Sequence, residues 1–175
     1  MNSPVYNKLL VHNPIRKKYI GKIRRKDHCY FCKGIKDQLL IKEYSYWRVL
    51  ANLYPFVDSA ILIVPKRHIE FTDETLKKEW SELQTIMDDL VWTWKKMYKD
   101  KPKSKKEKML DEGKPSYNFY INNGEHSGQT VRHLHWHFIP RVYRTYTGME
   151  LAEPFHKVRV TAKETQKLFK NNLRK

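Results

Sequence analysis

The segment His133-Leu-His-Trp-His-Phe-Ile139 decides how this chain is read, because three histidines alternate in it with bulky apolar residues. Successive side chains of a β-strand point to opposite faces. The alternation therefore predicts a strand over 133–139 with His133, His135 and His137 on one face. A lone histidine here would be read as a surface residue. Three in register, each able to bind a metal, move a proton or attack phosphorus, indicate a reactive site.

The composition is that of one globular domain with a high positive charge. The chain has 175 residues, of which 40% are apolar, enough for a single domain with a hydrophobic core. The net charge of +16 favours polyanionic partners such as nucleotides, with nucleic acid as a further candidate. Part of the charge lies in a lysine-rich stretch over about 99–115, which we expect to be a solvated loop.

Nothing in the sequence predicts membrane insertion. No stretch approaches the ~18–20 consecutive apolar residues of a membrane helix, and the N-terminus lacks an apolar core followed by a small-residue cleavage site. We therefore expect an intracellular chain, cytoplasmic, or nuclear if its source is a eukaryote or a virus.

Apolar periodicity predicts strands and two helices. Period-two or continuous apolar runs predict strands over 46–53, 60–64, 116–121, 142–146 and 156–160, in addition to the histidine strand. A helix is expected over 73–99, capped by Thr72 or Asp73, and a basic helix over 162–173. The first helix has an apolar stripe suited to a core or a dimer interface, made of Leu76, Trp80, Leu83, Met87, Leu90, Trp94 and Met97.

No linker separates two domains. We expect a basic N-terminal arm over 1–28, one domain over 29–160 and a basic C-terminal helix or tail over 161–175.

The two cysteines of the chain, Cys29 and Cys32, have the spacing of a zinc knuckle. In an intracellular protein such a pair indicates a metal site or a redox pair, and two buried thiols are a further alternative. The βαβ context typical of redox pairs is not evident. If the pair binds zinc, His68 and one histidine of the 133–139 segment are the candidates for the remaining ligands.

The three histidines suit phosphoryl or nucleotidyl transfer. A neutral imidazole nitrogen is a competent nucleophile at phosphorus, provided that a hydrogen bond at its other nitrogen fixes the tautomer. A second histidine can protonate the leaving group or contact the phosphate. Gln129 and Thr130, just before the histidines, supply neutral donors for developing negative charge.

The segment 133–139, preceded by Ser127-Gly-Gln-Thr-Val131, resembles the signature of the histidine-triad (HIT) superfamily. Asn13-Pro-Ile-Arg-Lys-Lys-Tyr-Ile20, the Cys-x-Phe-Cys motif, Asn52-Leu-Tyr-Pro-Phe56 and Val64-Pro-Lys-Arg-His68 follow the order of its zinc-containing branch, which includes diadenosine tetraphosphate hydrolases and phosphorylases. The resemblance covers roughly 13–141, apart from the lysine-rich stretch. It implies an α+β fold, a five-stranded antiparallel sheet with one long helix and a C-terminal helix, and a homodimer.

The resemblance also implies residue roles. His135 would be the nucleophile that accepts AMP, and His137 would contact the phosphate or assist the leaving group. His133 would complete a structural zinc site with Cys29, Cys32 and His68. The nucleotide would contact Asn52 at its ribose and Leu53 beside its adenine, and Asn122, Gln129 and Thr130 at its α-phosphate. From the sequence alone, Asn52 and Asn122 are equally well explained as turn residues.

One departure concerns the start of the 60–64 strand. Many relatives carry Gly-His where this chain has Ser59-Ala60. In those relatives the histidine helps to fix the active-site strand. Its replacement by Ala60 leaves the details of the proton relay and the rate open, but it leaves the nucleophile in place.

These features predict an enzyme that cleaves AMP–X substrates, such as diadenosine polyphosphates, through an adenylyl-histidine intermediate. Two alternatives stay open: an enzyme that removes 5′-AMP from nucleic-acid ends, which the positive charge favours, and a non-catalytic nucleotide-binding protein, with which Ala60 is compatible.

Overall fold

A computed structural model describes residues 29–33, 35, 39–55, 59–99, 116–141 and 160–174 of the chain. The N-terminal arm, the lysine-rich loop beyond Lys99 and the strands expected over 142–146 and 156–160, apart from Val160, lie outside these residues. Among the described helices, none is both long and apolar enough to cross a membrane.

The core of the fold is one five-stranded sheet with strand order β1-β2-β3-β5-β4, in which every pair of neighbours is antiparallel. The expectation of an α+β fold with a five-stranded antiparallel sheet is confirmed. The strands are β1 Leu40–Glu43, β2 Trp47–Ala51, β3 Ile61–Pro65, β4 Ser116–Ile121 and β5 Trp136–Arg141. The helices are α3 Tyr30–Lys33, α4 Lys77–Lys99 and α6 Ala162–Asn172, with short 3₁₀ turns η2 Thr72–Glu74 and η3 Glu125–Ser127.

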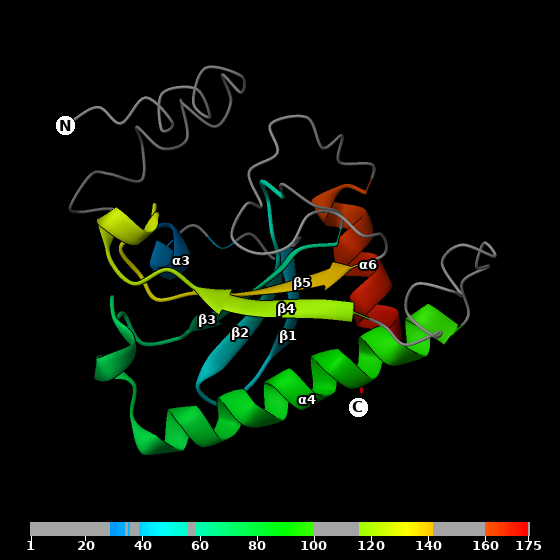
Figure 1. Cartoon of the computed structure of the whole chain (residues 1–175), viewed down its shortest axis with the longest axis horizontal. Helices are drawn as coiled ribbons and strands as arrows, with labels where there is room; N and C mark the ends of the chain where they lie inside the picture. Colours follow the sequence, from blue (N-terminus) through cyan, green and yellow to red (C-terminus); the bar gives the residue numbers. More distant parts are fainter. Residues whose placement is uncertain are drawn as a thin grey trace.

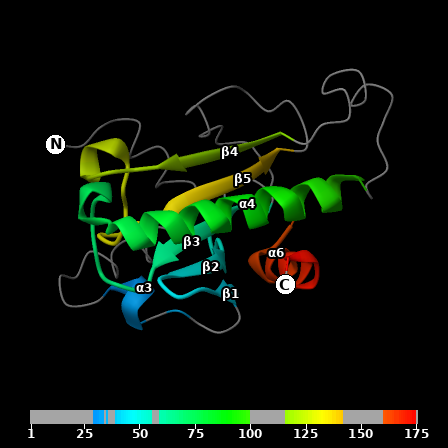
Figure 2. The ribbon, with the colours of Figure 1, turned by 90° about the horizontal axis from the view of Figure 1, so that it is seen from below.

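One face of the sheet packs against α4, which runs along the sheet in Figures 1 and 2, and against α6. The α4 residues Leu83, Leu90 and Trp94 are buried there, as the periodicity predicts. Two other members of the expected stripe, Leu76 and Trp80, are 47% and 41% exposed and so lie outside the core. The apolar stripe therefore serves the core over most of α4 but not over its first turn.

Two tryptophan side chains tie α4 to the sheet through hydrogen bonds. The Trp47 indole N–H donates to the carbonyl of Glu79 at 2.8 Å, and the Trp94 indole N–H donates to the carbonyl of Ser116 at 3.1 Å. Both indoles are almost fully buried, so these bonds satisfy donors that would otherwise be left without water in the core.

The expected start of the long helix at Asp73 is wrong. Residues Thr72–Glu74 form a separate 3₁₀ turn, and α4 begins at Lys77. The turn is closed by the Glu74 carboxylate, which accepts the Phe71 N–H at 2.8 Å. The Glu79 carboxylate accepts the Leu76 N–H at 2.8 Å and so caps α4 four residues later than expected.

The histidine strand is also shifted along the chain from its expected bounds of 133–139 and ends at Arg141. It begins at Trp136, not at His133, because the Leu134 N–H donates to the carbonyl of Ile69 at 2.6 Å and not to a neighbouring strand. The alternation of faces nevertheless extends upstream of the strand: Leu134 and Phe138 are buried in the core beneath the sheet, whereas His135 and His137 line a pocket on the opposite face.

The C-terminal helix docks at the edge of the sheet near β1. Thr161 and Glu164 form a reciprocal N-terminal capping box, and Phe169 is buried in the core. The Gln166 side-chain amide donates to the carbonyl of Leu40 at 2.6 Å. The predicted helix over 162–173 is therefore present, and its position is set by contacts with the first two strands.

Ser59 lies in the left-handed region, with φ of 60°, at the entry to β3. Residues other than glycine are strained in this region, and many of the relatives that the sequence resembles carry glycine there. We predict that Ser59→Gly raises the free energy of unfolding by about 1 kcal/mol, measured by urea denaturation. Ser59→Ala keeps the side-chain strain and is the control; an equal gain in both variants would contradict this explanation.

Candidate active site

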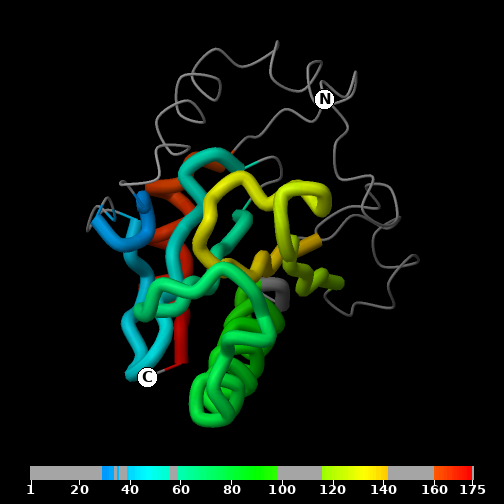
Figure 3. Tube along the Cα trace, turned by 90° about the vertical axis from the view of Figure 1, so that its left-hand side faces the viewer, coloured from blue at the N-terminus to red at the C-terminus, as the bar shows by residue number. Residues whose placement is uncertain are grey.

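The face of the sheet opposite α4 carries two adjoining clusters, a thiol–imidazole cluster and a pocket that contains two of the histidines. Both meet the segment 129–135, which leads into β5 and follows the yellow path over the sheet in Figure 3. The short helix α3 lies on the same side of the sheet (Figures 1 and 3).

The first cluster brings together the four residues that the family resemblance assigns to zinc, Cys29, Cys32, His68 and His133. Their ligand atoms all lie within 4.8 Å of one another. The Cys29 sulfur is 3.3 Å from Nδ1 of His133, and the Cys32 sulfur is 3.3 Å from Nδ1 of His68. The α3 turn holds the cysteines together, since the N–H groups of Cys32 and Lys33 both donate to the carbonyl of Cys29.

This cluster fits a tetrahedral zinc ion. Thiolate and imidazole ligands at ordinary zinc distances lie roughly 3.3–3.8 Å apart from one another, and the sulfur–nitrogen distances of 3.3–3.5 Å fall in that range. Nε2 of His133 donates to the carbonyl of Pro65 at 2.9 Å, which leaves Nδ1 as the lone-pair nitrogen facing the thiols. The donor set of two thiols and two imidazoles is one that zinc prefers.

Two groups of the cluster, Cys32 and His133, have pKa values shifted from their ordinary values. Burial, and then the hydrogen bond with the neighbouring Cys29, raise the pKa of the Cys32 thiol to about 11. Burial lowers the pKa of His133 to about 4, an effect that the hydrogen bond to Pro65 partly offsets. A neutral imidazole is therefore ready to bind, whereas the Cys32 thiol must lose its proton to a bound metal.

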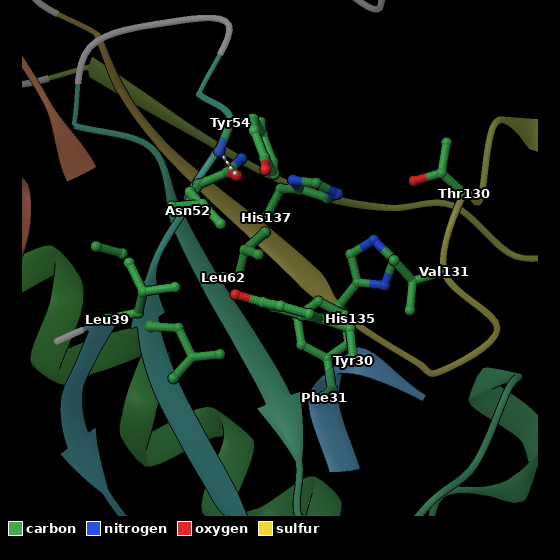
Figure 4. Close-up of a pocket in the computed structure, with 13 residues that line it drawn as sticks. Tyr30, Phe31, Leu39, Asn52, Tyr54, Leu62, Thr130, Val131, His135 and His137 are labelled. Atoms are coloured by element: carbon green, nitrogen blue, oxygen red, sulfur yellow. Dashed lines mark hydrogen bonds between the residues drawn. The ribbon is translucent and has the colours of Figure 1, made fainter. Parts of the chain in front are cut away.

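The second cluster is the pocket of Figure 4. Its apolar side is formed by Leu39, Leu50, Leu62, Phe31 and Val131. Its polar side is formed by His135, His137, Thr130, Asn52 and the two tyrosines Tyr30 and Tyr54. An apolar cavity with a few converging polar groups is the usual form of a small-molecule site.

His135 is held as a neutral imidazole of defined tautomer. Its Nδ1 lies 2.8 Å from the carbonyl oxygen of His133. Because a carbonyl can only accept, Nδ1 must carry the hydrogen, and Nε2 keeps the lone pair. Burial lowers the pKa of His135, although the bond to His133 opposes the effect, so the ring has the form that a nucleophile requires.

His137 lies beside His135 on the same side of the pocket (Figure 4), with ring centroids 5.1 Å apart. Burial, followed by the proximity of His135, lowers the pKa of His137 to about 3. The free protein therefore presents two neutral imidazoles at this end of the pocket at neutral pH. A neutral ring can donate a hydrogen bond to a phosphoryl oxygen or attack phosphorus, but neither ring is already protonated and able to act as a general acid.

Phe31 connects the two clusters. Its ring lies 5.6 Å from the ring of His133 and 5.4 Å from the ring of His135. Phe31 and Tyr30 stand between the two cysteines and were not predicted as site residues. The Cys-x-x-Cys motif could have indicated them, because a metal-binding turn beside a pocket places its two central side chains near that pocket.

The remaining residues predicted to bind nucleotide occupy different environments. Asn52, Leu53 and Thr130 line the pocket. The side-chain oxygen of Asn52 also accepts the N–H of Tyr54 at 3.0 Å, so the turn role and the pocket position coexist (Figure 4).

Gln129 and Asn122 do not line the pocket in this structure. The Gln129 amide donates to the carbonyl of Glu70 at 3.0 Å, and its oxygen accepts the N–H of Gly124 at 2.6 Å. Its side chain therefore braces the loop before the histidines. The phosphate contacts assigned to Gln129 and Asn122 stay predictions.

Residues 33–143 match the HIT domain family. The chain belongs to the HIT family. It is 34% identical over 116 residues to an uncharacterised HIT-like protein of Methanocaldococcus jannaschii, covering 65% of this chain and 78% of that protein. It is 30% identical over 117 residues to a bis(5′-adenosyl)-triphosphatase of Saccharomyces cerevisiae, covering 64% of this chain and 48% of that enzyme. The chain thus spans about half the length of the yeast enzyme.

Two solved structures share the fold of this chain. A Plasmodium falciparum diadenosine triphosphate hydrolase in complex with cyclomarin A superposes with a TM-score of 0.59 at 16% identity, covering 95% of both chains. A zinc-bound histidine-triad family protein from Mycobacterium smegmatis superposes with a TM-score of 0.52 at 16% identity, covering 89% of this chain and 91% of that one.

We predict that Cys32→Ser lowers zinc content and stability together. Loss of one thiolate should weaken zinc binding by at least about 100-fold, which removes about 2.7 kcal/mol of metal-linked stability. The measurements are zinc per chain by elemental analysis and the urea denaturation midpoint. His126→Asn, which changes an exposed histidine outside the cluster, is the matched control. Undiminished stability of a fully metal-free wild type would contradict the prediction.

The depressed pKa of His137 predicts loss of stability in acid. Its ordinary pKa is 6.5 and its folded pKa is about 3, so the unfolded chain takes up this proton first as the pH falls. The stabilisation is complete above pH 6.5 and decreases below it, by about 2 kcal/mol at pH 5. Urea denaturation of wild type and His137→Asn at pH 7.5 and pH 5 isolates this effect from any loss of zinc. Equal pH dependence in both proteins would show that His137 is not the cause.

Proposed function

We propose that the protein is a nucleotide hydrolase or transferase that cleaves AMP–X substrates, of which diadenosine polyphosphates are the class favoured here. The observation that carries the proposal is the hydrogen bond from Nδ1 of His135 to the carbonyl of His133. It leaves a neutral Nε2 lone pair on a ring that lines an apolar pocket, which is the arrangement needed for attack on phosphorus.

The pocket offers complementary surfaces for the parts of an adenylate. Leu50, Leu62 and Phe31 provide an apolar side for the base. Asn52 lies beyond this region with an amide able to contact the ribose, and Thr130 lies near the histidines with a hydroxyl able to donate to phosphate. This order along the pocket would place the α-phosphate at His135.

In the first step, Nε2 of His135 attacks the α-phosphorus, and the bond from phosphorus to the bridging oxygen breaks. The leaving group departs as a nucleoside polyphosphate anion. Its terminal phosphate needs no proton at neutral pH, because the second pKa of a phosphate ester is about 6. The ring retains its Nδ1 hydrogen, and the carbonyl of His133 stabilises the positive charge that the adenylyl-imidazole acquires.

In the second step, water or inorganic phosphate attacks the same phosphorus, and the phosphorus–nitrogen bond breaks. The electron pair returns to Nε2 of His135. Water yields AMP and releases a proton to solvent, whereas phosphate yields ADP. The enzyme would be a hydrolase in the first case and a phosphorylase in the second.

His137 acts in this scheme as a donor to a phosphoryl oxygen. Its pKa of about 3 in the free protein argues against a protonated general acid waiting in the pocket. A neutral ring still carries one N–H, and in the half-buried pocket this N–H would be directed at negative charge that grows in the transition state.

A zinc ion held by Cys29, Cys32, His68 and His133 would cross-link α3, the end of β3 and the segment before β5, and its contribution would be structural. His133 itself links this cluster to the reaction, because its ring faces the thiols while its carbonyl holds His135.

A homodimer is proposed as the assembly. The first turn of α4 and the preceding turn expose Phe71, Leu76 and Trp80, with 41%, 47% and 41% of their surfaces accessible. Neighbouring exposed apolar side chains of this size are typical of protein–protein contacts. Light scattering of wild type and of Leu76→Glu would test whether this region forms the dimer.

A second candidate is removal of 5′-AMP from nucleic-acid ends, which the net charge of +16 favours. The two candidates share the adenylyl-histidine step and differ in the leaving group. Faster release of AMP from an adenylated oligonucleotide than from dinucleotides, lost at high salt, would favour this candidate.

We predict that His135→Ala lowers turnover of diadenosine tri- and tetraphosphate by at least about 1,000-fold, because it removes the nucleophile. Chromatography of the nucleotides formed, with and without phosphate, is the measurement. AMP and ATP from the tetraphosphate would indicate a hydrolase; ADP and ATP formed only with phosphate would indicate a phosphorylase. Gln84→Ala, on the exposed face of α4, is the control, and near-wild-type turnover by His135→Ala would disprove the mechanism.

A further inference from the structure

Many relatives carry a histidine at position 60 that helps to fix the active-site strand, whereas this chain has Ala60. In this structure a different side chain, Tyr120, packs against Ala60 and stacks on His137 of that strand. Tyr120 of β4 is the direct partner of His137 of β5 in the antiparallel ladder. Their rings are stacked face to face, with centroids 4.4 Å apart and ring planes inclined by 4°. Directly opposed side chains on neighbouring antiparallel strands are close enough for such contacts, so the ladder itself sets this pair.

The position of the Tyr120 ring is determined by its neighbours on the same face of the sheet. Tyr120 packs against Ala60 and Ile139, both almost fully buried. A methyl group at position 60 leaves room for an aromatic ring next to it, whereas a larger side chain would compete for that space. Ala60, which the sequence alone marks as a loss, is therefore part of the surface that seats Tyr120.

Arg141, at the end of β5, interacts electrostatically with Tyr120. Burial lowers the pKa of this guanidinium, and the proximity of Tyr120 raises it. The Arg141 side chain is itself held, because its Nε donates to the side-chain oxygen of Asn118 at 2.7 Å. Asn118 and Tyr120 point to the same face of β4. The strand therefore supplies both the ring that stacks on His137 and the side chain that holds Arg141.

The stack supplies a restraint that rotamer preferences do not. The terminal torsion of a histidine side chain is broad, so the backbone and χ1 leave the plane of the imidazole weakly determined. For His135 that plane is set by the hydrogen bond to the His133 carbonyl. For His137, a parallel aromatic ring at contact distance restricts rotation of the imidazole and excludes water from one of its faces.

We propose that Tyr120 is a positioning residue of this active site, whose stacked ring fixes the plane of His137 so that the imidazole N–H meets the phosphate held at His135. The proposal rests on the proposed function for its catalytic consequence, and on the stacking geometry alone for its structural part. The aromatic ring carries the effect; the hydroxyl is not required.

The test uses the full-length, zinc-loaded protein and two kinds of variant. Tyr120→Phe keeps the ring, whereas Tyr120→Leu keeps apolar bulk without it, and Tyr120→Met is a second ringless variant if the leucine variant folds poorly. The first measurement is the NMR signal of the His137 ring protons, assigned by their absence in His137→Asn. A stacked aromatic ring shifts such signals upfield. We expect the shift to persist in Tyr120→Phe and to disappear in the ringless variants.

The second measurement is kcat and KM for diadenosine tri- and tetraphosphate. We expect the ringless variants to lose about tenfold or more in kcat, equal to about 1.4 kcal/mol of transition-state stabilisation, with KM within about twofold of wild type. Tyr120→Phe should stay within about twofold in both constants. Rescue by phenylalanine separates ring stacking from a role of the hydroxyl, and the kcat effect separates it from loss of substrate binding.

Unchanged His137 signals in the ringless variants would overturn the proposal, and so would changed signals with unchanged kcat. A large loss in Tyr120→Phe would also overturn it, because the effect would then belong to the hydroxyl. If the wild type turns over no AMP–X substrate, the proposed function fails, while the NMR measurement still decides whether Tyr120 fixes the plane of His137.

Discussion

The carbonyl and the ring of His133 form the junction on which the rest of the site depends. The carbonyl accepts the Nδ1 hydrogen of His135, and the ring donates to Pro65 at Nε2 while its Nδ1 faces the thiols of Cys29 and Cys32. A single residue therefore determines the tautomer of the proposed nucleophile and takes part in the thiol–imidazole cluster. Because all three bonds use different atoms of His133, they reinforce one another and do not compete.

The two faces of the sheet have different roles: one face packs into the hydrophobic core, and the other carries the candidate site. One face carries the core that α4 and α6 cover, in which Trp47, Trp94 and Phe138 are almost fully buried. That packing fixes β3 and β5 side by side, and the opposite face of the same strands then presents Leu62 and His137 to the pocket. A site built on neighbouring central strands is held to the precision of the ladder, which loops alone do not provide.

Much of this arrangement follows from local patterns in the sequence. The alternation around His135 identifies which side chains share a face, and it holds even where the strand itself has not begun, because Leu134 still points to the core. The edges of elements are less predictable: α4 begins at Lys77 since the carboxylates of Glu74 and Glu79 divide the expected first turn in two. Side-chain capping of this kind depends on which backbone groups are left unpaired, which periodicity does not encode.

Periodicity and spacing along the sequence determined the strands that became β2 to β5, the long helix, the cysteine pair and the row of histidines, and the family resemblance supplied the fold class. Strand β1, Leu40–Glu43, was not predicted, because its four residues are too few to show a periodic pattern. Only the tertiary structure decided which side chains from distant parts of the chain contact one another. It placed Phe31 between His133 and His135, committed the Gln129 amide to Glu70, and set Tyr120 against His137. These contacts join residues from different strands and loops, so they follow from strand order and register, which local patterns along the chain do not specify.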